Sequence, residues 1–139
     1  MTLLEFVTAR LTEDENVAKA ALGEYGAQGT GWSFSEENGE IDFGIPNEHF
    51  NIEPLGAFVN QATHMVRHEP RRVLADVAAK RSLLARHDRI GTRWVGLPRA
   101  DREERYCMGC DEAFPCETVR LLALPYSQHP GYRQSWRPL

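Results

Sequence analysis

Three cysteines stand within a stretch of ten residues in the last third of the chain. Cys107 and Cys110 are separated by two residues, and Cys116 follows after five more. Thiolates at this spacing can reach one tetrahedral metal ion, and the intervening Gly109 lets the backbone turn so that amide groups point at the sulfurs. Three incidental buried thiols are the alternative interpretation. The presence of a third cysteine so close to the other two makes incidental thiols the weaker interpretation, so the spacing predicts a metal site.

Three cysteines fill only three corners of a tetrahedron, so a closed structural site needs a fourth ligand. His87 is favoured because it follows Leu84 by three residues on the inward face of a predicted helix, close to where the chain leaves toward the cysteines. His129 is the main alternative, thirteen residues beyond Cys116. The predicted ligand set is therefore Cys107, Cys110, Cys116 and His87, and His129 is the alternative to His87.

The other histidines carry weaker signals. His64 and His68 are four residues apart and share one helical face, but this face lies opposite the apolar stripe. Such an exposed pair is more often plain surface than a metal site. His49 lies in a segment for which we predict no regular element.

We expect the metal to be a structural Zn²⁺, with an iron–sulfur centre as the open alternative. A zinc with one open position could instead activate water, and Glu112 or Glu117 would be near enough in sequence to act as the base. Three thiolates donate much charge, however, and make zinc a poorer Lewis acid. A thioredoxin-like Cys-x2-Cys lacks its strand-then-helix context here. We therefore predict no catalytic residues.

The first element that the sequence predicts is a helix over residues 1–25. Thr2 and Glu5 form a capping box, in which each side chain accepts a backbone N–H of the first turn. Apolar residues then recur at helical spacing, and Gly23 and Gly26 mark the end. A glycine-rich connector over 26–31 follows.

A β-hairpin is expected over residues 32–45. Trp32 and Phe34 would lie on one strand, Ile41 and Phe43 on the other, and Asn38-Gly39 would supply the turn. Two strands alone are marginal in water, so the aromatics should lean on the helices. The segment 46–52 reads as irregular.

A helical pair is predicted over residues 54–88. Pro54 suits a first-turn position, and Glu69-Pro70 divides the two helices because a residue before proline avoids the helical region. The inward stripes are Leu55, Phe58, Val59, Ala62 and Val66 in the second helix and Val73, Val77 and Leu84 in the third.

The zinc-stabilised C-terminal lobe is expected to span residues 87–139. We predict no regular element from Ile90 to Arg105, and a loop of this length needs the metal to tie it down. A fourth helix should run from Pro115 to Tyr126 with Cys116 in its first turn, and 130–136 should add one more turn. The fold class is thus mainly α with a small β-hairpin (α+β), with four to five helices in a single domain, 1–139.

Charge is distributed unevenly along the chain, whose net charge is −4. Residues 1–60 hold two basic and eleven acidic side chains, whereas residues 61–139 hold fourteen basic and nine acidic ones. The two halves can face each other within one fold or across a dimer, or the basic half can contact nucleic acid. The candidate contact surface comprises Arg67, Arg71, Arg72, Lys80 and Arg81.

Composition and the N-terminus bound the class of protein. Hydrophobic residues make up 42% and charged residues 26%, which is typical of a folded chain and not of a disordered one. No basic run precedes an apolar stretch at the N-terminus, and no apolar run is long enough to span a membrane. We expect a cytoplasmic protein, in which thiols stay reduced and cluster for metal binding.

Several segments together resemble one known family. They are His64 to Leu74, Ala79-Lys80-Arg81, His87, the Cys-x2-Cys pair, and Pro115 to Trp136, together with the opening helix and Trp32. The chain is similar to the uncharacterised domain-of-unknown-function family 6221 of actinobacteria and their phages, except around 33–53. This resemblance implies an intracellular protein of one domain and no established activity, and it supports the same four ligands. The cysteine spacing is also that of WhiB-like iron–sulfur regulators, but their upstream cysteine and glycine-tryptophan turn are missing here.

These observations favour a small zinc-stabilised binding or adaptor protein over an enzyme, and the resemblance implies a link to phages. We expect a protein partner. The alternatives are a nucleic-acid-binding regulator that uses the arginine-rich helices and, as a weaker one, a zinc-dependent hydrolase. The aromatic C-terminus (Tyr126, Tyr132 and Trp136) could be a docking patch, although we favour a covering role for it.

Overall fold

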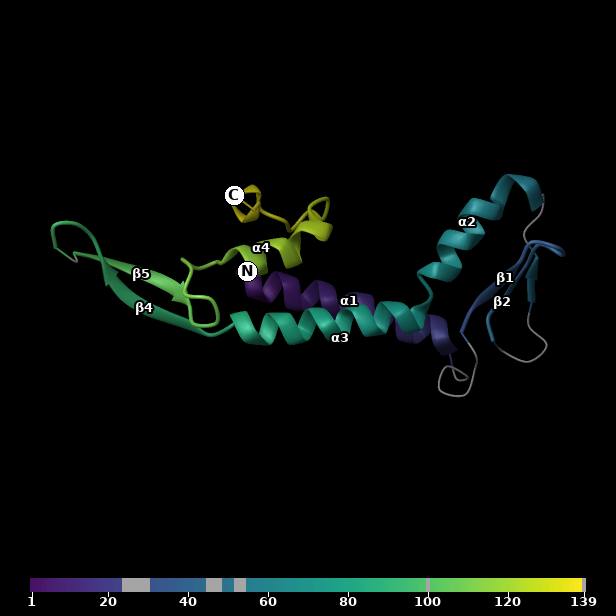
Figure 1. Cartoon of the computed structure of the whole chain (residues 1–139), viewed down its shortest axis with the longest axis horizontal. Coiled ribbons are helices and arrows are strands. Elements are labelled where there is room, and N and C mark those ends of the chain that lie inside the picture. The colour runs from purple at the N-terminus through teal and green to yellow at the C-terminus, as the bar shows by residue number, and fades with distance from the viewer. Residues whose placement is uncertain (24–30, 45–48, 52–54, 100, 139) are drawn as a thin grey trace. The chain divides into compact units, whose positions relative to one another are not determined.

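The computed structural model describes residues 1–23, 31–44, 49–51, 55–99 and 101–138 of the chain (Figure 1). Within these residues the chain forms helices and two small antiparallel sheets, an α+β fold. The elements in chain order are α1 (Leu3–Leu22), β1 (Ser33–Ser35), β2 (Glu40–Asp42), β3 (His49–Asn51), α2 (Leu55–Arg67), α3 (Pro70–His87), β4 (Ile90–Val95), β5 (Arg102–Cys107), α4 (Glu117–Ala123) and the 3₁₀ helices η2 (Leu124–Tyr126) and η3 (Gln134–Trp136).

The chain divides into two compact units, and the division falls within α1 and α3. Unit 1 comprises Met1–Glu13 and Ala78–Leu139, and unit 2 comprises Asp14–Val77. All three cysteines and His87 belong to unit 1.

The start of α1 forms as the capping box predicts. The backbone N–H of Thr2 donates to Glu5 Oε2 at 2.7 Å, and the backbone N–H of Glu5 donates to Thr2 Oγ1 at 3.2 Å. The helix ends at Leu22, and Gly23 follows with a φ of 59°, which glycine adopts without strain. Gly26 and most of the connector at 26–31 lie outside the described residues.

The core of unit 1 is built on the inward face of α1. Phe6, Val7 and Leu11 are fully buried there. The aromatic residues of the C-terminal segment pack around the Phe6 ring, whose centroid lies 5.1 Å from that of Trp136 and 6.0 Å from that of Tyr132. Because both of these side chains are buried, the C-terminal aromatics cover α1 and do not form an open docking patch.

The expectation of an irregular segment from Ile90 to Arg105 is wrong. Strands β4 and β5 pair antiparallel in register from Ile90↔Cys107 to Val95↔Arg102 (Figure 1). Their stabilising contacts are largely made by charged side chains. Arg93 lies over the Tyr106 ring and bridges to Glu104 at 3.0 Å. A strand built on such cross-strand pairs has little of the hydrophobic alternation that sequence reading relies on.

The last helix is shorter than predicted. Helix α4 begins at Glu117, so Cys116 precedes it as the N-cap residue and does not lie in its first turn. It ends at Ala123 and continues into the 3₁₀ helix η2, since Pro125 lacks the N–H that an α-helix needs. The further turn expected at 130–136 is η3.

Unit 2 contains a three-stranded sheet in the order β1-β2-β3. The two strands expected here form, and Gly39 has the positive φ that the turn requires. The turn itself differs from the expected two-residue Asn38-Gly39 turn, because the loop spans residues 36–39 and Phe34 therefore pairs with Ile41. Strand β3 corrects the irregular reading of 46–52, because His49–Asn51 pairs with β2. A three-residue strand offers too few positions for a periodic signal.

The helical pair lies where the sequence places it, as α2 and α3. Ala62 and Val77 are buried, and Leu84 is buried in unit 1, as their stripes predict. Pro54 and the side chains of Leu55 and Phe58 lie outside what the structure describes. None of the helices described here combines the length and the apolar character that crossing a membrane demands.

Candidate metal centre

Four side chains from different elements of unit 1 converge on one point. His87 is the last residue of α3, and Cys107 is the last residue of β5. Cys110 lies in the turn that follows, and Cys116 comes directly before α4. The cluster therefore joins the end of a long helix, the base of the β4–β5 hairpin and the start of α4.

The donor atoms are close enough for one ion. The Nδ1 atom of His87 lies 3.5 Å from Cys107 Sγ and 3.6 Å from Cys116 Sγ. All four donor atoms, including Cys110 Sγ, lie within 4.8 Å of one another. Cys107 and Cys116 are buried, whereas Cys110 is the most exposed of the three. The four residues could hold a metal ion.

Backbone amides point at the sulfurs. Burial raises the pKa of the Cys107 thiol, but the N–H groups of Gly109 and Cys110 and the neighbouring thiols outweigh it, so the net pKa is lowered. Burial also raises the pKa of Cys116, and it raises the pKa of Cys110 to about 12. The environment therefore favours the thiolate form of Cys107 more than that of Cys110 or Cys116, and a bound cation would favour the thiolate form of all three.

The turn after β5 holds the cysteines in place. The N–H of Cys107 donates to Glu112 O and that of Asp111 donates to Cys107 O, both at 2.8 Å. Gly109 passes so close to the end of α3 that a Cβ atom there would lie 1.9 Å from Arg86 O. Glycine is thus required at this position by the approach of two backbones.

His129, the alternative fourth ligand, lies elsewhere. Its ring packs against Phe6 with the centroids 5.5 Å apart, and its Nδ1 accepts the N–H of Gly131 at 2.9 Å. Its Nε2 lies 2.8 Å from Arg10 Nη1. The structure therefore brings His87, and not His129, to the cysteines.

The remaining histidines with described side chains, His64 and His68, form an exposed pair on α2 and just beyond it, with ring centroids 4.5 Å apart. No third candidate ligand joins them among the described residues. Burial against neighbouring groups, and then the charges of His64 and nearby arginines, lower the pKa of His68. The pair matches the surface interpretation.

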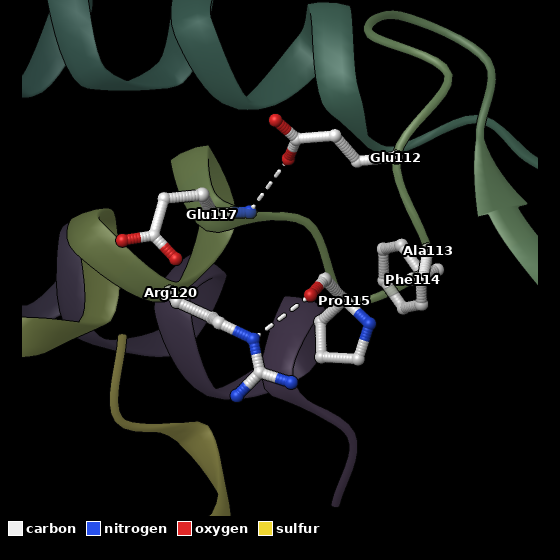
Figure 2. A pocket seen from close by; sticks show the side chains of 6 residues that line it. All are labelled: Glu112, Ala113, Phe114, Pro115, Glu117 and Arg120. Carbon is white, nitrogen blue, oxygen red and sulfur yellow. Dashed lines mark hydrogen bonds between the residues drawn. The ribbon is translucent and has the colours of Figure 1, made fainter. Parts of the chain in front are cut away.

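A pocket of about 290 Å³ is lined by residues that precede and follow Cys116 in the sequence, namely Glu112, Ala113, Phe114, Pro115, Glu117 and Arg120 (Figure 2). The Glu112 carboxylate, considered above as a possible base, accepts the N–H of Glu117 at 3.0 Å and so caps the start of α4. The Arg120 guanidinium donates to three backbone carbonyls, those of Pro115, Ser135 and Arg137. Two of the pocket's charged groups thus have structural partners.

The arginine-rich set predicted as a contact surface is divided between the two units. Arg72 donates to Arg67 O, and Arg81 donates to Thr12 Oγ1. Arg71, Lys80 and Arg81 make further interactions. Much of this set is therefore engaged within the fold.

Sequence reasoning missed the arginine that braces the cysteine turn. Arg93 reaches from β4 to Asp111, with its Nη1 2.9 Å from the carboxylate and 3.1 Å from the backbone carbonyl. Asp111 has a φ of 62°, a strained value for a residue other than glycine, and this contact helps to hold it. No local pattern links residues 18 positions apart, so only the hairpin fold reveals the contact.

Comparison with known proteins places the chain in one family. The model of a family of unknown function (DUF6221) matches residues 1–138, nearly the whole chain, so the protein belongs to this family. Searches of curated proteins and of solved structures give no match.

Proposed function

We propose that this protein is a small binding module in which one structural Zn²⁺, held by His87, Cys107, Cys110 and Cys116, fixes the C-terminal part. The observation that carries the proposal is the pair of distances from His87 Nδ1 to the sulfurs of Cys107 and Cys116, 3.5 and 3.6 Å. A tetrahedral zinc with Zn–S of about 2.3 Å and Zn–N of about 2.0–2.1 Å separates nitrogen from sulfur by about 3.6 Å. The donors thus have the spacing of ligands to one ion.

The donor set favours zinc over an iron–sulfur centre. Three thiolates and an imidazole are a common structural zinc set, whereas the usual iron–sulfur clusters take four cysteines. Each thiolate of a cubane cluster binds a different iron, so its sulfurs stand farther apart than the ligands of a single ion. The 4.8 Å limit on the donor separations suits a single ion better.

The proposed zinc has a structural task. Its ligands belong to the end of α3, the end of β5 and the start of α4. An isolated two-stranded sheet such as β4–β5 is marginal in water. Because metal binding to a site that exists only in the fold contributes folding free energy, zinc would stabilise the hairpin base.

Binding is better supported than catalysis. Four protein ligands fill a tetrahedron and leave no position for a substrate or an activated water. The Glu112 carboxylate accepts a hydrogen bond from the backbone N–H of Glu117 at the start of α4. A zinc-dependent hydrolase would therefore need His87 to leave the metal, and nothing in the geometry favours this.

Nucleic acid is the second candidate class of partner beside a protein. The excess of fourteen basic over nine acidic side chains in residues 61–139 favours it. On the sequence-based proposal the contact lies on Arg67, Arg71, Arg72, Lys80 and Arg81. Such binding would weaken steeply with salt as counterions are released from the phosphates.

Metal analysis of the purified full chain, paired with thermal unfolding before and after chelation, tests the proposal. We expect one zinc per chain and a clear fall in the melting temperature when a chelator removes it. A chain that is folded and equally stable without any metal would refute the structural role.

A further inference from the structure

The β4–β5 hairpin exposes two large apolar side chains that the fold does not use. Trp94 is 66% exposed, and Leu97, in the turn between the strands, is 98% exposed. By contrast, Trp136 is only 6% exposed. Two large exposed apolar side chains on one short hairpin make it a candidate contact surface.

The two faces of the hairpin differ. Trp94 pairs with Glu103, and Thr92, two residues before it on the same face, pairs with Arg105. All four of these side chains are exposed. The opposite face is covered, since Arg93 lies 5.0 Å from the Tyr106 ring centroid and bridges to Glu104. One face of the hairpin therefore exposes the Trp94 indole, with Arg105 diagonal to it across the two strands.

Three arginines of the hairpin and its base have no carboxylate partner among the described residues. Among the described residues, neither Arg89, at the base of the hairpin, nor Arg99, at its tip, has a hydrogen bond or ion pair from its side chain. The Arg105 guanidinium lies over the Phe114 ring, 5.4 Å from its centroid, and has no carboxylate partner in the part of the chain that the structure describes. Unit 1 as a whole holds twelve basic and nine acidic side chains, a positive balance, whereas unit 2 is acidic. The hairpin therefore suits an anionic partner with flat, stackable groups.

We propose that the Trp94 face of the β4–β5 hairpin binds single-stranded nucleic acid, with Trp94 stacking on a base and Arg99 and Arg105 contacting phosphates. The inference rests on the proposed binding role and gives it a partner and a surface. Base stacking needs an accessible ring face and tolerates any base, and the arginines supply the counter-charge along the backbone. Bases within a duplex are already stacked on each other, so double-stranded nucleic acid is a poorer fit.

A substitution at Glu103 tests the proposal by an expected gain in affinity, whereas the other substitutions test it by a loss. The Glu103 carboxylate stands opposite Trp94 and repels a phosphate chain that crosses the indole. Replacing it by glutamine removes this charge and keeps the shape. Glu103→Gln should therefore bind single strands more tightly than the natural protein, which mere loss of structure could not produce.

The experiment measures fluorescence anisotropy of a labelled oligo(dT) of about 20 nucleotides with the zinc-loaded full chain. We expect binding that weakens as salt rises from about 50 to about 200 mM, and preference over a duplex of the same length. Trp94→Ala should reduce affinity roughly 5- to 150-fold, the range expected for one stacked base. Trp94→Phe should retain part of the affinity, and Arg99→Ala and Arg105→Ala should each lower both affinity and salt dependence.

Arg137→Ala, an exposed arginine outside the hairpin, serves as the matched control and should bind as the natural protein does. Zinc content and melting temperature of every variant separate the two proposals. A zinc-loaded, folded chain that does not bind the oligonucleotide even at low salt overturns this inference alone. Binding that Trp94→Ala leaves unchanged, or that Arg67→Ala and Arg72→Ala abolish instead, also overturns it, by placing the contact on the helices.

Discussion

His87 Nδ1 lies 3.5 Å from Cys107 Sγ, although the two residues are 20 positions apart in the sequence. The contact brings the last residue of α3 to the last residue of β5, with the whole β4–β5 hairpin between them. The base of the hairpin is therefore closed by two side chains that share a proposed ion. The predictions below follow from this closure and from the contacts around it.

Removing the imidazole should open the metal site. We expect His87→Ala to lower zinc affinity by more than the about 10- to 100-fold that loss of an outer partner of a ligand costs, because a ligand itself is lost. Competition with a chromogenic chelator measures the affinity. His129→Ala is the matched control, since that ring lies against Phe6. Stoichiometric, tightly held zinc in His87→Ala would show that the ligand assignment is wrong.

Gly109 should tolerate no side chain. A Cβ atom would lie 1.9 Å from Arg86 O, so Gly109→Ala must push the cysteine turn away from α3. We expect a loss of about 1 to 3 kcal/mol in the free energy of unfolding, together with weaker zinc binding. Gly131→Ala is the control, because its Cβ would meet side chains and no backbone atom, the nearest being His129 Nδ1 at 3.2 Å and Phe6 Cε2 at 3.6 Å. Equal chemical-denaturation curves and zinc affinities for the two variants would contradict the close approach.

Arg120 should hold the C-terminal segment. Its guanidinium donates to Pro115 O at 2.9 Å, Ser135 O at 2.7 Å and Arg137 O at 3.1 Å (Figure 2 shows the first). Arg120→Ala should cost about 1.5 to 3 kcal/mol in urea unfolding, because hydrogen bonds from a charged group are lost. Arg120→Lys should recover only part, since one ammonium cannot reproduce the fork of donors. Full stability in Arg120→Ala would show that these bonds are dispensable.

The capping box of α1 should make stability depend on pH. The backbone N–H of Thr2, followed by its hydroxyl, holds the pKa of Glu5 below its ordinary value of 4.5. A carboxyl group with a lowered folded-state pKa stabilises the fold above its unfolded pKa and loses this effect as pH falls through the folded value. The natural protein should therefore melt above Glu5→Gln at about pH 7, and the gap should close toward about pH 3. A gap that stays constant over this range would contradict the bond.

The sequence could predict the helices because their signals are local. Thr2 and Glu5 are three residues apart, and Glu69-Pro70 divides α2 from α3 within one dipeptide. The hairpin could not be predicted in this way. Its strands are rich in arginine and glutamate, and their contacts, such as that of Arg93 with Asp111, appear only after the strands pair.

The candidate metal site also combines residues with a local sequence signal and a residue that only the fold identifies. The cysteine spacing is a local signal, so three of the four clustered residues were evident from the sequence alone. The sequence leaves His87 and His129 as candidates for the fourth position, and only the fold distinguishes them. The His129 ring packs against Phe6, whereas His87 lies with the three cysteines. Trp94 carried no signal at all, because its exposure depends on a strand that the sequence did not reveal.

X-ray absorption spectroscopy at the zinc edge, on the purified full chain, tests the central claim most directly. We expect one zinc with three sulfur neighbours at about 2.3 Å and one nitrogen at about 2.0–2.1 Å. In His87→Ala, the nitrogen should be replaced by a water or buffer oxygen, or the zinc should be lost. An iron signal, a shell with fewer than three sulfurs, or a folded chain without metal would contradict the account.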